Sequence, residues 1–272
     1  MPRKHSGRKD ANVKNPLRIS CLATDRVGSA MLLVLLCCFV VLPTAGFAGE
    51  WRVAPIKLEL GSDARSGVIS VVNEGTGKFQ VQMKAFLWEQ DADGKDQLTE
   101  TKDLIFFPKI MVFEKPEERI LRAGIKIPAA TKEKTYRLFI EEIPEPKKAD
   151  GTNIAVAIRF GVPIFVKPLK EDPKGEIAKL ELVNGECRVT VKNSGNVHFI
   201  ITAVNFTGKD LKGQETFAKK LDGWYLLNGA SRVYTAALPK QSCAETATLA
   251  VEITTNKFVL DGKLDVDKSL CQ

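Results

Sequence analysis

The fold is decided by residues 79–87, Phe-Gln-Val-Gln-Met-Lys-Ala-Phe-Leu. Every second side chain in this stretch is apolar, namely Phe79, Val81, Met83, Ala85 and Leu87. Successive side chains of a β-strand point to opposite faces of the sheet, so a period of two indicates a strand. One face of this strand should lie on a core and the other in water, as in an antiparallel sheet.

Short apolar runs of the same kind surround this stretch on both sides. Turn signals such as Asn73-Glu-Gly75, Asp93-Gly94 and Asp150-Gly151 separate them. Seven strands within about 115 residues are typical of a two-sheet sandwich of immunoglobulin type. The predicted strands are residues 51–60, 67–73, 79–87, 104–113, 119–123, 135–143 and 154–166.

A charged, proline-rich segment, Lys167 to Gly175, follows the seventh strand and is suited to link two domains. A second β-rich series comes after it, with predicted strands at residues 178–183, 187–192, 198–205, 231–237, 246–254 and 262–267. The prediction is therefore an all-β chain of two tandem sandwiches, at residues 49–168 and 169–272.

Residues 1–48 read as a secretory signal peptide. They hold seven basic and two acidic residues, and thus most of the formal net charge of +7. An apolar run of twelve residues, Met31–Leu42, follows the basic stretch, and small residues surround position 48. That run is too short for a comfortable bilayer span, which favours a cleaved signal over a permanent anchor. The remaining chain is nearly neutral, so no nucleic-acid-binding face is expected.

Export places Cys187, Cys243 and Cys271 in an oxidising compartment, which allows one disulfide and one free thiol. Cys243 and Cys271 lie symmetrically about residue 257, where the last two predicted strands would turn. Cys187 alternates with Val189 and Val191 on a buried face. We predict the Cys243–Cys271 bridge, with Cys187–Cys243 as the alternative.

Residues that could carry chemistry are few. Residues 89–100 resemble a calcium loop, but a hairpin turning on Asp93-Gly94 explains them better, because Asp-Gly is a strong turn signal. Of the two histidines, His5 and His198, only His198 follows the leader, and we expect it to be a strand residue. We therefore predict no enzymatic activity, no metal and no cofactor. A hydrolase or calcium-dependent binder would depend on the acidic loop alone.

Several segments together resemble the PapD-like periplasmic pilus-assembly chaperones. The resemblance covers residues 50–272 and has the character of a divergent branch; it is carried by Trp51–Leu60, Val71–Gly75, Arg119–Gly124, Tyr136–Pro144, Arg159–Pro168 and Gly223–Arg232. It implies two immunoglobulin-like sandwiches arranged as a boomerang. It also implies a periplasmic protein that binds fimbrial subunits by donating a β-strand and delivers them to an outer-membrane usher.

The resemblance places the donated strand at the end of the first sandwich. Ile154, Val156 and Ile158 match the alternating apolar residues that the family inserts into a subunit. The alternative, that all three face their own core, stays open at this point. Phe160, Val162 and Ile164 are assigned to the core of the chain itself.

The family anchors the subunit's terminal carboxylate with an arginine and a lysine. Lys57 stands near the arginine position, Pro163 occupies the lysine position, and Arg159 on the same strand face could substitute. The alternative function is a structural fibre subunit or envelope protein with immunoglobulin-like domains.

Overall fold

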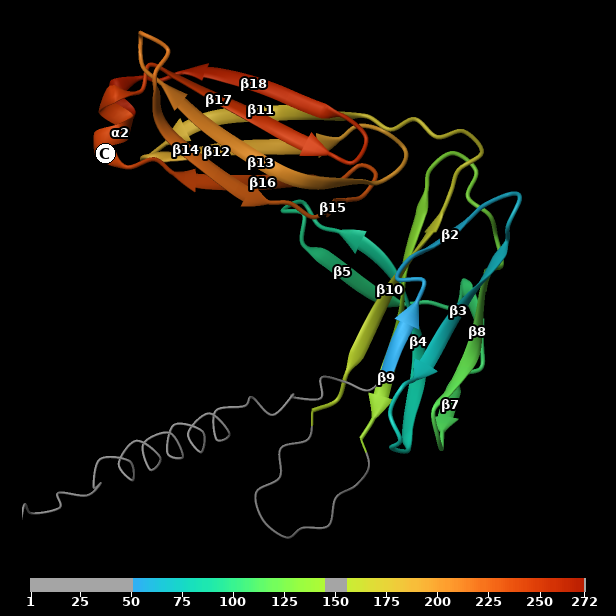
Figure 1. The fold of residues 1–272 in the computed structure, drawn as a ribbon. Coiled ribbons are helices and arrows are strands. Elements are labelled where there is room, and N and C mark those ends of the chain that lie inside the picture. Colours follow the sequence, from blue (N-terminus) through green and yellow to red (C-terminus); the bar gives the residue numbers. More distant parts are fainter. Residues whose placement is uncertain (1–50, 145–155, 272) are drawn as a thin grey trace, which may run out of the picture. The chain divides into compact units, whose positions relative to one another are not determined.

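The computed structural model describes residues 51–144 and 156–271, which lie in one compact unit. Their strands make four sheets, which form two sandwiches (Figure 1). The first sandwich packs a four-stranded sheet against a six-stranded one, and all but one of its strand pairs are antiparallel. The four-stranded sheet has the order β1 (Trp51–Ala54), β3 (Ser66–Asn73), β8 (Glu117–Ile125) and β6 (Leu104–Phe107).

The six-stranded sheet holds the candidate site. Its order is β2 (Leu58–Leu60), β10 (Arg159–Val166), β9 (Lys134–Ile143), β4 (Phe79–Gln90) and β5 (Asp96–Glu100), and β7 (Ile110–Phe113) also pairs with β4. β2 is the exception to the antiparallel rule, since it runs parallel to β10. The alternation read from residues 79–87 is confirmed, because Val81, Met83 and Ala85 are all buried in the core between the two sheets.

Two of the predicted strands are broken in the structure. The run 51–60 divides into β1 and β2 around Pro55, and the run 104–113 divides into β6 and β7 around Pro108. Proline has no N–H to donate to a strand ladder, so each proline lets the chain leave one sheet and join the other. The prediction of 154–166 as one strand is also corrected, because β10 begins at Arg159, and β5 was not predicted.

The second sandwich contains the remaining strands. One sheet has the order β11 (Gly175–Val183), β12 (Glu186–Asn193) and β16 (Ser231–Ala237). The other has the order β14 (Glu215–Asp222), β13 (Phe199–Lys209), β17 (Thr248–Thr255) and β18 (Val259–Asp265), and β15 (Tyr225–Leu226) pairs with β13. β14, β15 and the short helix α2 (Lys240–Glu245) were not predicted. The all-β fold of two immunoglobulin-like sandwiches is confirmed, whereas the exact domain boundaries stay a prediction.

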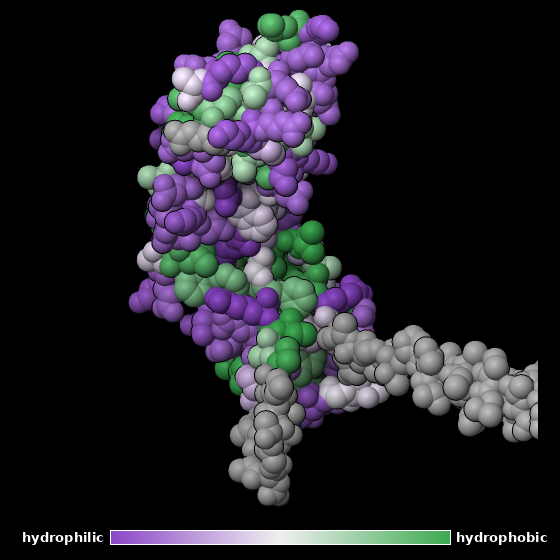
Figure 2. All heavy atoms as spheres, turned by 90° about the vertical axis from the view of Figure 1, so that its left-hand side faces the viewer, coloured by the Kyte–Doolittle hydropathy of each residue, from purple (hydrophilic) through white to green (hydrophobic). Residues whose placement is uncertain are grey.

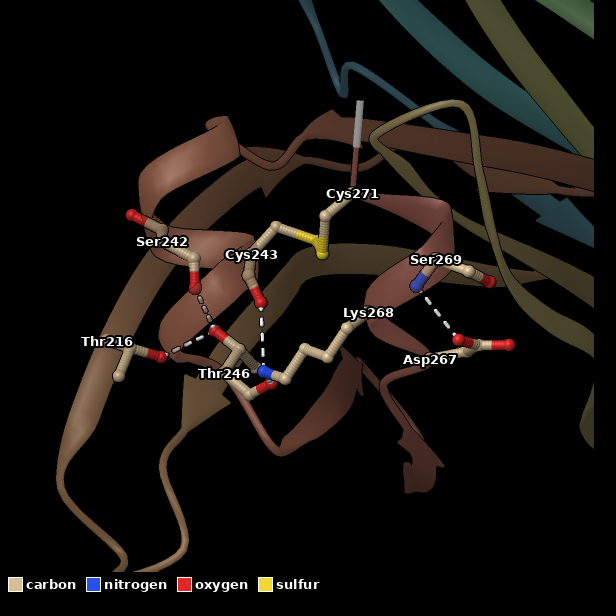
Figure 3. The surroundings of a disulfide bond; sticks show 8 residues. All are labelled: Thr216, Ser242, Cys243, Thr246, Asp267, Lys268, Ser269 and Cys271. Carbon is tan, nitrogen blue, oxygen red and sulfur yellow. Dashed lines mark hydrogen bonds between the residues drawn. A yellow bond between two sulfur atoms is a disulfide. The ribbon is translucent and has the colours of Figure 1, made fainter.

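A disulfide joins the two ends of the β17–β18 hairpin (Figure 3). Cys243 lies in α2 and Cys271 follows the 3-10 helix η1 (Lys268–Leu270), with Cα atoms 5.6 Å apart. The ammonium group of Lys268 donates to the carbonyl oxygens of Cys243 and Thr246, which holds the two helical turns together. The predicted pairing is present, and Cys187 is a buried thiol whose pKa is raised to about 11 by desolvation.

Hydrophobic surface is unevenly distributed between the sandwiches. In the face shown in Figure 2, apolar residues gather over the first sandwich in the lower half, and the second sandwich presents mostly hydrophilic side chains. Exposed apolar side chains of the first sandwich include Ile56, Ile105, Phe107, Ile110 and Val156. Large exposed apolar groups of this kind often mark an interaction surface.

Candidate functional site

The outer edge of β10 is only partly covered. β9 pairs with β10 along its whole length, but on the other side β2 reaches only residues 164–166. Ile158, just before β10, turns its carbonyl toward the β9 side, where it accepts from the backbone N–H of Glu142 at 2.9 Å. Because backbone groups alternate along a strand, those of Arg159 and Gly161 face the open side. The carbonyl of Pro163 faces the same side, but the parallel pairing of Ile164 with Leu58 uses it. Within the described ranges, this segment is an edge without a strand partner.

The apolar row of β10 continues beyond the sandwich. Val162 and Ile164 are buried, and Phe160 is half-buried with its ring 4.6 Å from that of Trp51. Ile158 is also half-buried and packs against the same core. The next side chain on this face, Val156, is 80% exposed. The assignment of Phe160, Val162 and Ile164 to the core is confirmed.

The three predicted donor residues therefore differ in their surroundings. Val156 does not face the core of its own sandwich, whereas Ile158 does so in part. Ile154 lies outside the described residues. The role of the three in binding a partner stays a prediction.

Arg159 lies at the start of the open edge and is already paired. Its guanidinium forms an ion pair with Glu141 of β9, with Nε 2.7 Å from Oε1. The same guanidinium stacks on the ring of Phe139, with Cζ 3.6 Å from the ring centroid. Glu141 also pairs with Lys84 of β4 at 3.2 Å. A partner's carboxylate would therefore have to share Arg159 with Glu141.

Lys57, the other predicted anchor, directly precedes β2 and lies beside the middle of β10, whereas Arg159 lies at the start of β10. Leu58 pairs with Ile164, which places Lys57 level with Pro163, four residues from Arg159. At about 3.3 Å per residue the two positions are about 13 Å apart, so the structure does not bring Lys57 and Arg159 together.

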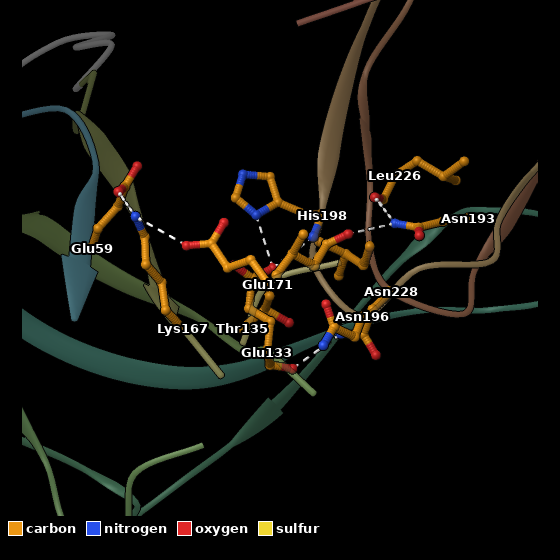
Figure 4. A network of polar contacts seen from close by, with 12 residues as sticks. Glu59, Glu133, Thr135, Lys167, Glu171, Asn193, Asn196, His198, Leu226 and Asn228 are labelled. Atoms are coloured by element: carbon orange, nitrogen blue, oxygen red, sulfur yellow. Dashed lines mark hydrogen bonds and ion pairs between the residues drawn. The ribbon is translucent and has the colours of Figure 1, made fainter. Parts of the chain in front are cut away.

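The Lys57 ammonium is 3.0 Å from Glu59, a carboxylate that also binds Lys167 at 2.7 Å. Lys167 in turn approaches Glu171 at 3.4 Å, so these charges form one network beside β2 and the end of β10 (Figure 4).

A comparison with protein families identifies the first sandwich. Residues 51–171 match the model of the PapD N-terminal domain, described as a pili and flagellar-assembly chaperone domain. The match begins at β1 and includes the whole of β10 with its open edge.

The first sandwich belongs to the PapD-like pilus-assembly chaperone family.

A curated relative of this PapD-like chain is the chaperone protein FanE of Escherichia coli. The two are 27% identical over 124 residues, which cover 43% of this chain and 54% of FanE. The match thus spans about half the length of that relative.

Solved structures of the family share the fold of the PapD-like chain. A chaperone–tip subunit complex of the archaic Csu pili of Acinetobacter baumannii aligns with a TM-score of 0.57 and 16% identity, over 78% of this chain and 98% of that one. The Salmonella enterica SafA pilin complex with the SafB chaperone aligns with a TM-score of 0.52 and 11% identity, over 80% and 97%. At such identities the likeness establishes the fold.

One buried polar cluster of this PapD-like chain was not predicted. Glu133 accepts a hydrogen bond from the backbone N–H of His198 at 2.8 Å, and its carboxylate lies 2.8 Å from Nδ1 of the same ring (Figure 4). His198 directly precedes β13 rather than lying in it, and its ring stacks on Phe165 with centroids 3.6 Å apart. Glu133 is 65 residues away in sequence, so local spacing held no signal for this pair.

Arg137 is a second residue that the sequence analysis did not single out. It follows Tyr136, which is buried, and so lies on the outer face of β9 by strand alternation. The period of two in residues 135–143 predicted which face of the sheet carries Arg137. It could not predict which side chains from other strands contact Arg137.

Within residues 51–144 and 156–271, no three His, Cys, Asp or Glu side chains come together as a group able to hold a metal ion. The helices of these ranges are too short or too polar to span a bilayer.

Proposed function

We propose that this PapD-like protein is a non-enzymatic periplasmic chaperone for fimbrial or other surface-fibre subunits. It would hold a subunit that lacks its last strand by adding the segment that carries Ile154, Val156 and Ile158 to the subunit's sheet. It would then deliver the subunit to an outer-membrane usher. Family membership supports the kind of activity, and the open edge of β10 is the observation that carries the mechanism.

The edge supplies backbone pairing. An incomplete sheet exposes unpaired N–H and C=O groups, which make it prone to aggregation. Arg159 and Gly161 offer both groups to a strand on the open side. Each main-chain hydrogen bond contributes about 0.5–1.5 kcal/mol net. This part of the interaction does not depend on the partner's sequence.

The side chains supply apolar contact. Val156 is exposed in the free chain, so docking into a partner's groove would remove it from water. Complete burial of a valine or isoleucine contributes about 1.5–3 kcal/mol. Ile158 gains less, because its own core already covers part of it.

Residues 1–48 support the proposal that the protein acts in the periplasm. A basic stretch followed by twelve apolar residues is the pattern of a secretory signal, which would place the chain after residue 48 in the periplasm. A disulfide in the second sandwich fits an oxidising compartment.

The first test is capture of a subunit from the periplasm. The chain is co-expressed with a candidate fimbrial subunit, and the co-purified subunit is quantified for wild type and Val156→Asp. We expect the variant to capture at least about tenfold less, because it loses apolar burial and places a charge in the groove.

Val259→Asp is the matched control, since it makes the same exchange at a 52% exposed valine of β18. Its capture should equal that of wild type. A folded Val156→Asp chain that captures normally would contradict strand donation. Co-assembly of the chain into the fibre itself would favour a structural subunit instead.

Lys57→Ala and Arg159→Ala should each weaken capture, and full capture by both would remove them as carboxylate anchors.

A further inference from the structure

The outer face of the four-stranded sheet in the first sandwich carries large apolar side chains. On β6, Ile105 and Phe107 are 55% and 75% exposed. Leu104 of the same strand is buried in the core, so strand alternation turns the other two to the outer face. Ile120 of β8 and Val68 of β3 are exposed on the same face. We call Val68, Ile105, Phe107 and Ile120 the outer-face cluster.

The register of the strands makes the members of this cluster neighbours around one arginine. Arg122 of β8 pairs with Phe107 on one side and with Val68 on the other, so the three residues form one row across the sheet. Ile120 and Ile105 each lie one step along a strand from this row, on opposite sides of it. Such steps are about 7 Å along a strand and about 5 Å between strands. The cluster is therefore continuous, with a single cation at its centre.

Lysines border the cluster at its β6 side. A groove of about 840 Å³ runs beside β6, and Ile105 lines it together with Leu104 and Phe106. The lining includes one carboxylate, that of Glu100, and several lysines. These are Lys84, Lys102, Lys109 and Lys126. The β6 edge therefore combines apolar side chains with an excess of positive charge.

Most of these cations have no carboxylate partner. Lys84 pairs with Glu141 at 3.2 Å. Among the residues that the structure describes, the other three lysines and Arg122 form no ion pair, whereas Lys78 of the same sandwich pairs with Glu114 at 3.0 Å. The cations beside the cluster are thus available to an anionic partner.

The acidic side chains near the cluster lie at its margin. Asp103 directly precedes β6, and Glu118 lies beyond Ile120 on β8. Neither forms an ion pair within residues 51–144 and 156–271, in contrast to Glu117, which pairs with Arg119 at 3.1 Å. The positive charge is therefore concentrated on the β6 side, next to the two most exposed apolar side chains.

We propose that the outer-face cluster binds the surface of a membrane that contains anionic phospholipid. Phe107 and Ile105 project into water, so they can enter the boundary between headgroups and acyl chains. A lysine lays its apolar stem along such a surface while its ammonium reaches a lipid phosphate. Each cation held near an anionic bilayer raises the affinity about fivefold. Export beside a membrane is required, whereas donation of a strand is not.

The chemistry of the face favours a lipid surface over a second protein. A protein partner receives apolar anchors in well-packed pockets. Here the anchors project from a sheet instead, and they are surrounded by flexible, unpaired cations. A bilayer surface accepts projecting groups without a preformed pocket and supplies many phosphates at once. Charge complementarity therefore selects anionic lipid as the occupant.

The first test is flotation of the wild-type chain, purified from the periplasm, with lipid vesicles. One set of vesicles contains phosphatidylglycerol and phosphatidylethanolamine in equal parts, and the other contains phosphatidylcholine alone. We expect the chain to float with the anionic vesicles only. Binding should fall at least about tenfold when added salt shortens the Debye length from about 10 Å to about 3 Å. Equal binding to both sets, or binding to neither, would overturn the proposal.

The second test removes the apolar part of the face. Phe107→Ser should bind the anionic vesicles at least about tenfold less than wild type, because it loses the most exposed member of the cluster. Leu211→Ser is the matched control, since Leu211 of the second sandwich is 95% exposed, and it should bind as wild type does. All variants share residues 1–48, so this basic and apolar segment does not affect the comparison.

The third test removes charge. The double variant Lys102→Gln, Lys126→Gln should also bind at least about tenfold less. Its control is Lys219→Gln, Lys220→Gln, which makes the same exchange at two exposed lysines of β14. Unchanged binding by both Phe107→Ser and the Lys102, Lys126 double variant would overturn the assignment to this face.

Further outcomes separate the membrane surface from the chaperone function. Phe107→Ser should capture a fimbrial subunit as wild type does, and Val156→Asp should bind vesicles as wild type does. Loss of capture by Phe107→Ser would place a protein partner on the face and overturn the lipid assignment. A dimer in sedimentation velocity that Phe107→Ser dissociates would assign the face to a second copy, with the same consequence. A chain that captures no subunit but floats with anionic vesicles would contradict the chaperone function and support the membrane surface.

Discussion

Glu59 shows at the scale of a single residue how β2 is held beside β10. Its carboxylate accepts from Lys167 at 2.7 Å and from Lys57 at 3.0 Å. These contacts, with the Lys167 hydrogen bond as the largest cause, lower the pKa of Glu59 from 4.5 to about 2. Both predicted anchors therefore already form ion pairs within the chain, Lys57 with Glu59 and Arg159 with Glu141.

The first residue-scale prediction concerns this carboxylate. Lys167→Met should raise the pKa of Glu59 toward 4.5, and Lys57→Met should raise it less, because Lys167 is the larger cause. An acid with a lowered pKa stabilises the fold above its unfolded value and loses that contribution as the pH falls. Wild type should therefore lose more stability than Lys167→Met between pH 4.5 and about pH 2. Carboxyl ¹³C NMR gives the pKa, and an unchanged value in Lys167→Met would contradict this assignment.

At the scale of an element, the β4–β5 hairpin is a contact between the sandwiches rather than a calcium loop. Oδ1 of Asp91 accepts from the backbone N–H groups of Asp93 and Lys95, at 3.0 and 2.9 Å, so its carboxylate serves the turn itself. The hairpin also contacts the second sandwich, where the side-chain amide of Gln90 donates to the carbonyl of Tyr225 at 2.9 Å. The hairpin interpretation of Asp93-Gly94 is confirmed.

Two glycines allow an element-scale prediction. Gly94 has a φ of +74°, and a Cβ there would lie 2.7 Å from the carbonyl oxygen of Ser231. Gly213, in the β13–β14 turn, has a φ of +82° and nothing within 4 Å of such an atom. Gly213→Ala should cost about 1–2 kcal/mol through backbone conformation alone. Gly94→Ala should cost about 1 kcal/mol more, because it also meets backbone of the second sandwich. Urea unfolding measures the free energy of unfolding of both variants. Equal losses would show that the close approach of Gly94 to Ser231 does not resist an added methyl group.

At the scale of the whole molecule, the described residues form two core clusters, and the disulfide belongs to the second sandwich. Trp88 of β4 and Phe165 of β10 pack in the second cluster although their strands belong to the first sandwich. The bridge closes a loop with a sequence separation of 28. The chain-entropy model gives such a bridge about 3–4 kcal/mol of stability. The mutual arrangement of the sandwiches implied by the resemblance stays a prediction.

A prediction for the molecule follows from this asymmetry. The double variant Cys243→Ser, Cys271→Ser should lose about 3–4 kcal/mol of stability in the second sandwich. Hydrogen exchange should rise in β17 and β18 and stay unchanged in β3 and β8, whose buried apolar residues all belong to the other core. Reduction of wild type should reproduce the effect, and reduction of the variant should add nothing. Equal loss of protection in both sandwiches would show that they unfold as one unit.

Much of this architecture could be predicted from local sequence. The period of two around Val81 and around Val189 set the buried faces of both sandwiches, because strand geometry alone decides which side chains share a face. Pro55 and Pro108 were the sequence signal for the two strand breaks, because proline cannot donate to a strand ladder. The two-residue β15 and the six-residue α2 are too short for a periodic pattern, so sequence reasoning could not find them.

The candidate site divides in the same way. By itself, the sequence determined the all-β sandwiches, the Cys243–Cys271 choice and the position of the apolar row at Val156 and Ile158, since each depends on spacing along one segment. Only the tertiary structure decided that β2 stops short and leaves an edge at Arg159, that Glu133 meets His198, and that Arg137 lies over the ring of Trp88. These features join residues distant in the chain, and contacts of that kind are set by how the sheets pack.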